Sequence, residues 1–581
     1  MHRAAHLLLI CASLFSLFLC NTSVAAQDTK STQSAVSPSP IAAAGDRPAT
    51  DVAAPPTGVA VPPNPLGEAT ILFRKGDLDG AFAKYQAIIA ANSKSPDAYA
   101  GIVQIYLKRK DVNQAYETVQ KALQVADSVP VRVALGEVYF RQGKIPEAEQ
   151  EWVKVINSGR QSARAFYGLA KVRAALSMYK SAWTMLDKAH QLDPADPEIR
   201  RMWIAKLDRA ARIKFYEDYL AGENNEDAET RANLKHYLDY LKARSLNSSP
   251  CQLTTKATAT EAPLLRLLSD AQHLRGFGLP VSINGENFHL LLDTGASGIL
   301  INRRAAEKAG VIKLSDIEMG GIGDKGRKSG YIGLAKSLKV GNLEFQNCPV
   351  SVLQDRSVVG EDGLVGSNVF GGFLVDLDFA HEKLRLAQLP KRPGETASKL
   401  DLQTSDDDED AQENESDKDQ KDQKHSDVMT DRLQDRYIAP EMNSYTRVYR
   451  FGHLLLVPTL VGGSPSKLFA LDTGSFSNTI SPATAREVTR VRGEAGTTVK
   501  GISGSVDKVF SADKAVLQFG HLRQENQDLI AFDMTHLSDN VGTEVSGFLG
   551  FTLLRLLEIK IDYRDGLVDF EYDPALWKWL Q

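Results

Sequence analysis

The chain carries two copies of one short motif, and they decide its fold: His289-Leu-Leu-Leu-Asp293-Thr294-Gly295-Ala296-Ser297 and Leu468-Phe-Ala-Leu-Asp472-Thr473-Gly474-Ser475-Phe476. In each copy a short apolar run, typical of a buried strand, ends at a loop that begins with Asp-Thr-Gly. The two aspartates lie 179 residues apart. A chain that repeats one strand and loop can bring two carboxylates together from equivalent positions.

The sequence around the motif also repeats in the same order. A Gly-rich segment follows the first copy at 319–326 and the second at 499–504. A Gly-apolar-apolar-Gly element comes next, at 363–366 and 547–550. From each motif aspartate to the last glycine of that element there are 73 residues in one half and 78 in the other. The recurring order and spacing indicate an internal duplication.

These motifs resemble the retropepsin-like (gag-polyprotein putative) aspartyl proteases of bacteria, over residues 270–390 and 445–575. The resemblance implies two mostly-β lobes, at 265–392 and 439–578. Each lobe would be a closed barrel, and the two would pair as a pepsin-type pseudo-dimer. A Gly-rich flap would cover the site from each lobe. The flap residues are Gly320, Gly321, Ile322 and Gly323 in the first lobe and Gly501, Ile502, Ser503 and Gly504 in the second.

The activity implied by the resemblance is peptide-bond hydrolysis, with Asp293 and Asp472 as the catalytic pair. Two carboxylates in contact cannot both ionise, so the pair holds one proton. The ionised member takes a proton from the attacking water, and the protonated member donates to the carbonyl of the substrate. Because the pair titrates as a unit, neither aspartate is assigned one role. This chemistry uses no cofactor and no metal, and the substrate is a protein or peptide.

The residues after each aspartate would support the catalytic loops. They are Thr294, Gly295 and Ala296 in the first half and Thr473, Gly474 and Ser475 in the second. In the family the threonines lock the two loops together, and the glycines allow close approach of the backbone. The third position differs between the halves. The hydroxyl of Ser475 can bond the outer carboxylate oxygen of Asp472, whereas Ala296 has no hydroxyl.

The second half departs from the family pattern. Ser367-Asn368 follows the first Gly-apolar-apolar-Gly element and is close to the usual polar pair, but Phe551-Thr552 follows the second. Two alternatives to an active single-chain protease therefore stay open. One is a non-catalytic repeat scaffold whose protease-like lobes only bind peptide. The other is an enzyme assembled from lobes of two chains, which the long linker between the lobes permits.

The N-terminal segment predicts export. A basic start, an apolar stretch from Leu7 to Cys20 and small residues before Ala26 are typical of a cleavable signal peptide at 1–26. Residues 27–64, rich in Ala, Pro and Ser, read as a disordered tether. We expect a periplasmic or extracellular protein with no transmembrane segment in the mature chain. Cys251 and Cys348 are the cysteines beyond this segment, and they form either a disulfide or two separate thiols.

Residues 393–438 read as an acidic, disordered linker. Between Ser405 and Asp427 there are 11 Asp and Glu against 3 Lys, a net charge of −8. The whole chain has a net charge of −5, so the remainder sums to +3. The acidity is thus a property of the linker, and the charge pattern predicts no nucleic-acid partner.

A helical pattern occupies residues 65–246. Small alanines recur at spacings of 34, 33 and 34, at Ala81, Ala115, Ala148 and Ala182. This resembles tetratricopeptide repeats, in which a small residue sits where two helices cross. The resemblance implies an all-α solenoid that docks a substrate or partner protein. Because the periodicity changes type after residue 246, we expect this domain to fold independently of the lobes.

Overall fold

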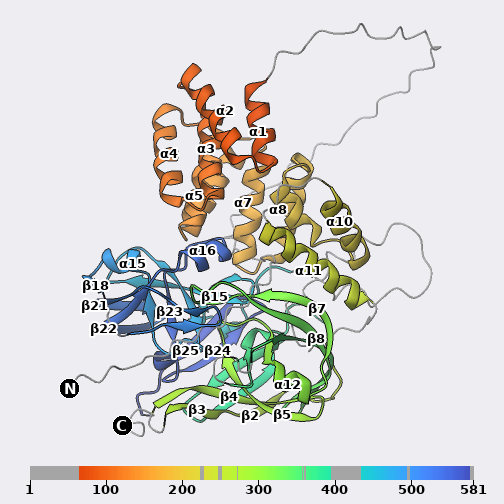
Figure 1. Ribbon diagram of the computed structural model, residues 1–581. Coiled ribbons are helices and arrows are strands. Elements are labelled where there is room, and N and C mark those ends of the chain that lie inside the picture. The colour runs from red at the N-terminus through yellow and green to blue at the C-terminus, as the bar shows by residue number, and fades with distance from the viewer. Residues whose placement is uncertain are drawn as a thin grey trace, which may run out of the picture.

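The computed structural model describes residues 64–222, 228–245, 251–270, 273–355, 358, 361–393, 395, 434–493 and 497–575. The predicted signal peptide, nearly all of the tether and most of the acidic linker lie outside these residues. Helices form the upper part of the molecule and strands form the lower part (Figure 1). We call residues 251–395 the first half of the strand-rich part and residues 434–575 the second half.

The helical domain runs from Pro65 to Ser245. Its helices are α1 (Pro65–Arg74), α2 (Leu78–Ala91), α3 (Pro96–Lys108), α4 (Val112–Val125), α5 (Val129–Arg141), α6 (Ile145–Asn157), α7 (Ala163–Ala175), α8 (Tyr179–Leu192), α9 (Pro197–Ile204), α10 (Arg209–Ala221) and α11 (Ala228–Ser245). The four periodic alanines are all buried, as the repeat pattern predicts. Trp152 fills the space between α5 and α7, where Gly136 and Gly168 leave room. A Cβ on either glycine would lie within 2.6 Å of its indole.

The first half is built on a nine-stranded sheet of the order β1-β9-β6-β10-β5-β4-β8-β7, in which β3 pairs with β4 and β8 also pairs with β9. Its elements are β1 (Gln252–Leu253), β2 (Thr260–Pro263), β3 (Leu265–Asp270), β4 (His273–Ile283), β5 (Glu286–Asp293), β6 (Ile299–Asn302), α12 (Arg303–Lys308), β7 (Ile312–Met319), β8 (Lys328–Val340), β9 (Leu343–Leu353), β10 (Gly363–Gly366), η1 (Ser367–Phe370), β11 (Phe373–Asp378) and β12 (Lys383–Gln388).

The second half repeats this plan around an eight-stranded sheet of the order β14-β15-β16-β23-β17-β22-β21-β18, in which β15 also pairs with β21. Its elements are η2 (Pro440–Met442), β13 (Thr446–Arg447), β14 (Tyr449–Phe451), β15 (Leu454–Val461), β16 (Lys467–Asp472), β17 (Thr479–Ile480), α15 (Pro482–Arg486), β18 (Val491–Gly493), β19 (Lys500–Gly501), β20 (Gly504–Ser505), β21 (Val509–Phe519), β22 (Leu522–Phe532), α16 (Thr535–Val541), β23 (Gly547–Gly550), α17 (Phe551–Leu554), β24 (Glu558–Asp562) and β25 (Leu567–Glu571).

A third sheet joins the two halves. Its order is β13-β25-β24-β11-β12-β2, so three strands of the second half continue directly into three strands of the first half. The joint is the antiparallel pair of β11 and β24, in which Leu374 faces Asp562 and Asp378 faces Glu558. One apolar cluster spans both halves across this sheet, with Val375 and Ile561 among its fully buried members. The halves are thus continuous in both backbone pairing and core.

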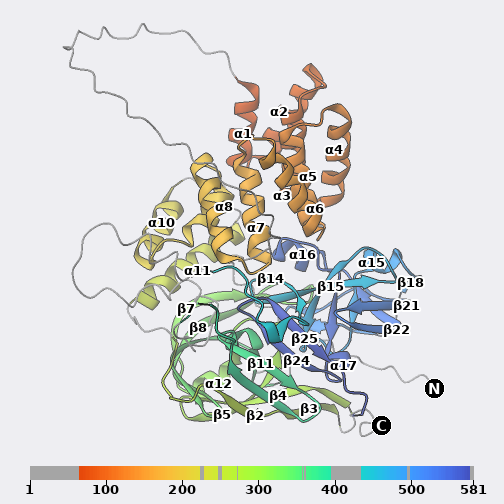
Figure 2. The same ribbon diagram turned by 180° about the vertical axis from the view of Figure 1, so that it is seen from behind.

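The helical domain packs on the second half. Figures 1 and 2 show α16 lying beneath the ends of α5 and α7. Phe140 and Phe451 pack with ring centroids 6.0 Å apart, and Arg141 pairs with Asp539 at 2.7 Å. The hydroxyl of Thr543 donates to the carbonyl of Phe140 at 2.7 Å. Independent folding of the helical domain therefore stays a prediction. If the domain is separated from the second half, this partly apolar, hydrogen-bonded interface becomes exposed to water.

The end of the acidic linker is part of that interface. Helix α8 has no side chain of its own to cap its N-terminus. Asp435 supplies the cap from the linker, because its carboxylate accepts from the amide of Ser181 at 2.9 Å and from its hydroxyl at 2.7 Å. The carbonyl of Gln434 accepts from the amide of Tyr179. A carboxylate at this position also favours the positive end of the helix dipole.

The last helices contact the first half. α10 and α11 share an apolar cluster that includes the buried side chains of Tyr216 and Leu238. Leu314 of β7 and Ile332 of β8 pack against the same cluster. The hydroxyl of Ser315 donates to the carbonyl of His236 in α11 at 3.1 Å. The hairpin formed by β7 and β8 is therefore held at its base by the helical domain.

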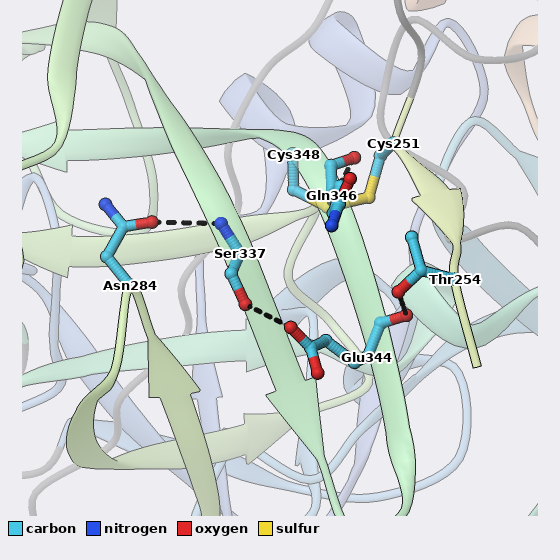
Figure 3. Close-up of a disulfide and its surroundings, with 7 residues drawn as sticks. All are labelled: Cys251, Thr254, Asn284, Ser337, Glu344, Gln346 and Cys348. Atoms are coloured by element: carbon cyan, nitrogen blue, oxygen red, sulfur yellow. Dashed lines mark hydrogen bonds between the residues drawn. A yellow bond between two sulfur atoms is a disulfide. The ribbon is translucent and has the colours of Figure 1, made fainter.

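A disulfide between Cys251 and Cys348 fixes the start of the first half, which settles the choice left open by the sequence. It lies beside the antiparallel pair of β1 and β9. Figure 3 shows Thr254 beyond β1 bonded to Glu344, which in turn accepts from the hydroxyl of Ser337. The bond closes a loop of 97 residues, and such a crosslink stabilises by about 4–5 kcal/mol in the chain-entropy account.

Candidate active site

The two Asp-Thr-Gly loops begin at equivalent strand ends. Asp293 ends β5, which pairs in parallel with β10 so that Asp293 lies opposite Gly366. Asp472 ends β16, which pairs in parallel with β23 so that Asp472 lies opposite Gly550. The last four residues of β5 and the last five residues of β16 are buried. The duplicated motif therefore produces duplicated geometry.

Reciprocal hydrogen bonds lock the loops together. The amide of Thr294 donates to the hydroxyl oxygen of Thr473 at 3.0 Å, and the amide of Thr473 donates to that of Thr294 at 2.9 Å. The hydroxyl of Thr294 then donates across the interface to the carbonyl of Leu471 at 2.8 Å, and the hydroxyl of Thr473 donates to the carbonyl of Leu292 at 2.9 Å. Both threonines are buried. The structure thus places the predicted threonines where they join the halves.

The two carboxylates face the opposite loop. Asp293 and Asp472 are 0% and 2% exposed. The amide of Gly295 donates to Asp293 at 2.8 Å, and the amide of Gly474 donates to Asp472 at 2.9 Å. A Cβ on Gly295 would lie 2.6 Å from Cγ of Asp472, and one on Gly474 would lie 2.3 Å from Oδ2 of Asp293. Only glycine leaves room for each carboxylate beside the other loop.

The residue after each glycine behaves differently from the sequence expectation. The hydroxyl of Ser475 donates to the carbonyl of Ser477 at 3.1 Å, so its one proton is directed away from Asp472. Its amide donates to the carboxylate of Asp472 instead, at 3.0 Å. The expected hydroxyl contact is therefore corrected to a backbone contact. Ala296 is fully buried against the first half and the tip residue Ile502.

Two asparagines, one of them missed from the sequence, hold the loops from behind. In the first half, the side-chain oxygen of Asn368 accepts from the amide of Gly298 at 3.2 Å. In the second half, Asn478 accepts from the amide of Gly550 at 2.8 Å. Both bonds join the loop after Asp-Thr-Gly to the Gly-apolar-apolar-Gly element of the same half. The asparagine follows the element in the first half, whereas it lies in the loop in the second half. This explains how the second half does without an asparagine at the position of Asn368, where it has Thr552.

The predicted flap residues meet at the tips of two hairpins. The amide of Gly321 donates to the hydroxyl of Ser503 at 3.0 Å, and the amide of Ser503 donates to the carbonyl of Ile322 at 3.1 Å. The amide of Lys325 donates to the carbonyl of Ser503 at 2.8 Å. Gly323 has a φ of +128°, and a Cβ there would lie 2.5 Å from the backbone of Ser503. The tips therefore interlock in a closed arrangement.

Each tip buries an isoleucine in the other half. Ile322 is 7% exposed and belongs to a cluster that contains Val509 and Phe548 of the second half. Ile502 is 6% exposed and belongs to a cluster that contains Leu291 and Leu364 of the first half. The exchange is reciprocal, so closure buries apolar surface on both sides at once.

His453 is a half-buried polar group beside the first loop that sequence analysis did not single out. It lies in the turn between β14 and β15. Burial lowers its pKa to about 4, and a hydrogen bond with the backbone of Gly295 acts in the opposite direction. Its imidazole is therefore neutral near pH 7. No pattern in the sequence marks this histidine, because only the pairing of the halves brings it to Gly295.

Among the residues that the structure describes, no three His, Cys, Asp or Glu side chains gather where they would hold a metal ion. The same described residues include no helix that is both long enough and apolar enough to span a membrane.

Comparison with known proteins identifies the two classes of domain. Residues 279–369 match the aspartyl protease family, and residues 72–128 match the tetratricopeptide repeat family. The chain thus joins N-terminal tetratricopeptide repeats to a strand-rich region with an aspartyl protease domain. A TPR repeat-containing protein of Methanocaldococcus jannaschii is 24% identical over 153 residues, which cover 25% of this chain and 27% of that protein. The chain therefore spans about a quarter of the length of that relative.

Proposed function

We propose that the protein is an exported aspartic endopeptidase in which Asp293 and Asp472 activate one water for attack on a peptide bond. The observation that carries the proposal is the mutual approach of the two loops, in which each glycine lies against the carboxylate of the other half. Carboxylates held this close share a proton. The ionised one takes a proton from water, and the protonated one donates to the carbonyl oxygen of the substrate.

The two halves act as a pseudo-dimer of closed barrels within one chain. The extra pairings of β8 with β9 and of β15 with β21 support closure of each barrel. The paired strands β11 and β24 support assembly within the chain. The carboxylate of Asp565 also supports this, because it accepts from Arg392 just before the linker and from the amide of Tyr437 at the end of the linker. The two ends of the linker are thus tied to one carboxylate, which favours pairing within a chain over exchange between chains.

Export is supported by the disulfide. Such bonds persist in oxidising compartments, namely the periplasm and the extracellular space. Cys251 and Cys348 are both buried. The disulfide fits the signal peptide predicted at the N-terminus. The tetratricopeptide repeats, in this proposal, dock the substrate or a partner protein beside the protease.

The decisive experiment compares wild type with Asp293→Asn and Asp472→Asn on an unstructured protein such as casein, with fragments identified by mass spectrometry. Each variant should lose at least about a thousandfold in rate, and the double variant should lose no more, because the pair acts as one unit. Asp528→Asn, at an exposed aspartate on β22, is the matched control. Cleavage by either dyad variant at the wild-type rate would refute the proposal.

The same assay separates the alternatives. A wild type that binds peptide but cleaves nothing between pH 3 and 8 would favour a non-catalytic scaffold. A specific activity that falls on dilution would favour an enzyme assembled from two chains. The single-chain proposal predicts a specific activity that is independent of concentration.

A further inference from the structure

The duplication places two pairs of side chains across the boundary between the halves. The residue after each Gly-apolar-apolar-Gly element is Ser367 in the first half and Phe551 in the second. Thirteen residues after the last glycine of each element, the residue just beyond the next strand is Phe379 in the first half and Tyr563 in the second. Ser367 of the first half contacts Tyr563 of the second half, and Phe551 of the second half contacts Phe379 of the first half. The two contacts are therefore counterparts.

Their chemistry differs. Ser367 and Tyr563 are fully buried, and their hydroxyl groups are hydrogen bonded to each other. Phe551 and Phe379 instead form an edge-to-face aromatic pair with ring centroids 6.1 Å apart. Phe277 completes that second contact at 5.4 Å from Phe379 and 5.6 Å from Phe551. One side of the boundary is thus polar, and the other is wholly aromatic.

The polar pair is connected to the loop of Asp293. Ser367 follows Gly366, which lies opposite Asp293 in the paired strands. The amide of Gly366 donates to the carbonyl of Gly298 at 2.7 Å, and Asn368 accepts from the amide of Gly298 at 3.2 Å. Ser367 therefore sits between two residues that hold the first catalytic loop. A displacement of Ser367 would reach that loop through both contacts.

Tyr563 is itself held from behind. Nη1 of Arg450 donates to the carbonyl of Tyr563 at 3.1 Å and to the hydroxyl of Tyr179 at 2.9 Å. Burial raises the pKa of Tyr563 above its usual value, with a smaller contribution from the charge of Asp293. Its hydroxyl keeps its proton at neutral pH and stays available for the bond to Ser367. The polar contacts run from helix α8 of the repeats to the first catalytic loop.

We propose that Tyr563, acting through Ser367, is a positioning residue for the loop of Asp293, while the loop of Asp472 depends on the Phe379–Phe551 contact. The two catalytic carboxylates thereby have non-equivalent supports. The kinetic consequence of this inference rests on the proposed peptidase function, whereas its structural consequence does not.

The test uses Tyr563→Phe, which removes one oxygen and gives the residue that the first half has at 379. Ser367→Ala removes the other hydroxyl, and the double variant removes both. Each single variant leaves a buried hydroxyl without a partner, so we expect kcat to fall about tenfold with KM unchanged. The double variant should lose no more than the worse single one, because both act through one bond.

Hydrogen–deuterium exchange provides a readout that does not need activity. Tyr563→Phe should speed exchange in peptides covering 291–300 about tenfold and leave 470–479 unchanged. Phe379→Leu, the matched control at the aromatic contact, should give the opposite pattern. Equal changes in both loops, or a lower melting temperature with unchanged kcat and unchanged exchange at 291–300, would overturn the inference. An inactive wild type would refute the proposed function, and the exchange pattern would still decide this inference.

Discussion

Replacing Thr473 by Val should weaken the joint between the two Asp-Thr-Gly loops. Valine has the same shape as threonine but no hydroxyl. In the structure that hydroxyl accepts from the amide of Thr294 at 3.0 Å and donates to the carbonyl of Leu292 at 2.9 Å. The variant therefore removes two hydrogen bonds that cross between the halves, and it leaves the packing volume unchanged.

The expected magnitude follows from the groups left behind. A buried donor or acceptor that loses its partner destabilises the fold by about 1–3 kcal/mol. Two such groups give about 2–6 kcal/mol for Thr473→Val. Thr473→Ser keeps the hydroxyl and loses one methyl group, a loss of about 1 kcal/mol. The serine variant is thus the matched control, because it separates the hydrogen bonds from the packing.

Hydrogen–deuterium exchange measures this locally, which suits a large protein whose unfolding has more than one step. Peptides covering 286–296 and 467–476 should exchange at least about 30-fold faster in Thr473→Val than in wild type. In Thr473→Ser they should exchange within about tenfold of wild type, and peptidase activity should follow the same order. Equal exchange in the two variants would refute the view that these hydroxyl groups hold the loops together.

Other features give separate expectations. Proteolytic nicking within 396–433 should leave the halves co-eluting on gel filtration, because β11 and β24 stay paired; clean separation would show a weak interface. Burial and then the charge of Asp565 raise the pKa of Asp562 to about 7, so its contribution to stability is complete below pH 4 and is lost as pH rises through 7. The melting temperature of wild type should thus fall more between pH 5 and 8 than that of Asp562→Asn, and equal slopes would contradict this. Gly323→Ala should raise KM by blocking flap closure, whereas Gly326→Ala, at a glycine that also has a positive φ but has open space around it, should not.

The sequence predicted the parts of the site that lie within one repeated motif. The aspartates, threonines and glycines of both loops occupy the positions that the duplication indicates, because strand and loop are local features. The interlocking flap residues also fall where the Gly-rich segments predict them. The periodic alanines are buried for the same local reason, since the helical repeat brings each one to a crossing point.

Contacts between distant segments could not be predicted in this way. Even the local bond of Ser475 depends on the shape of the folded loop, which directs its hydroxyl to the carbonyl of Ser477. His453 reaches Gly295 only when the halves pair. The interface of the repeats with both halves depends on side chains such as Phe140 and Leu314, which in sequence look like ordinary core residues. Such contacts leave no periodic signal along the chain.

The asymmetry between the halves has a physical basis in the duplication itself. Two identical lobes would give each carboxylate the same surroundings, and a symmetric pair differs only in which member holds the proton. Here the carboxylate of Asp472 accepts from the amides of Gly474 and Ser475, and the carboxylate of Asp293 accepts from the amide of Gly295. A single chain can accumulate such differences because each half mutates independently, while the reciprocal threonine bonds keep the two loops in register.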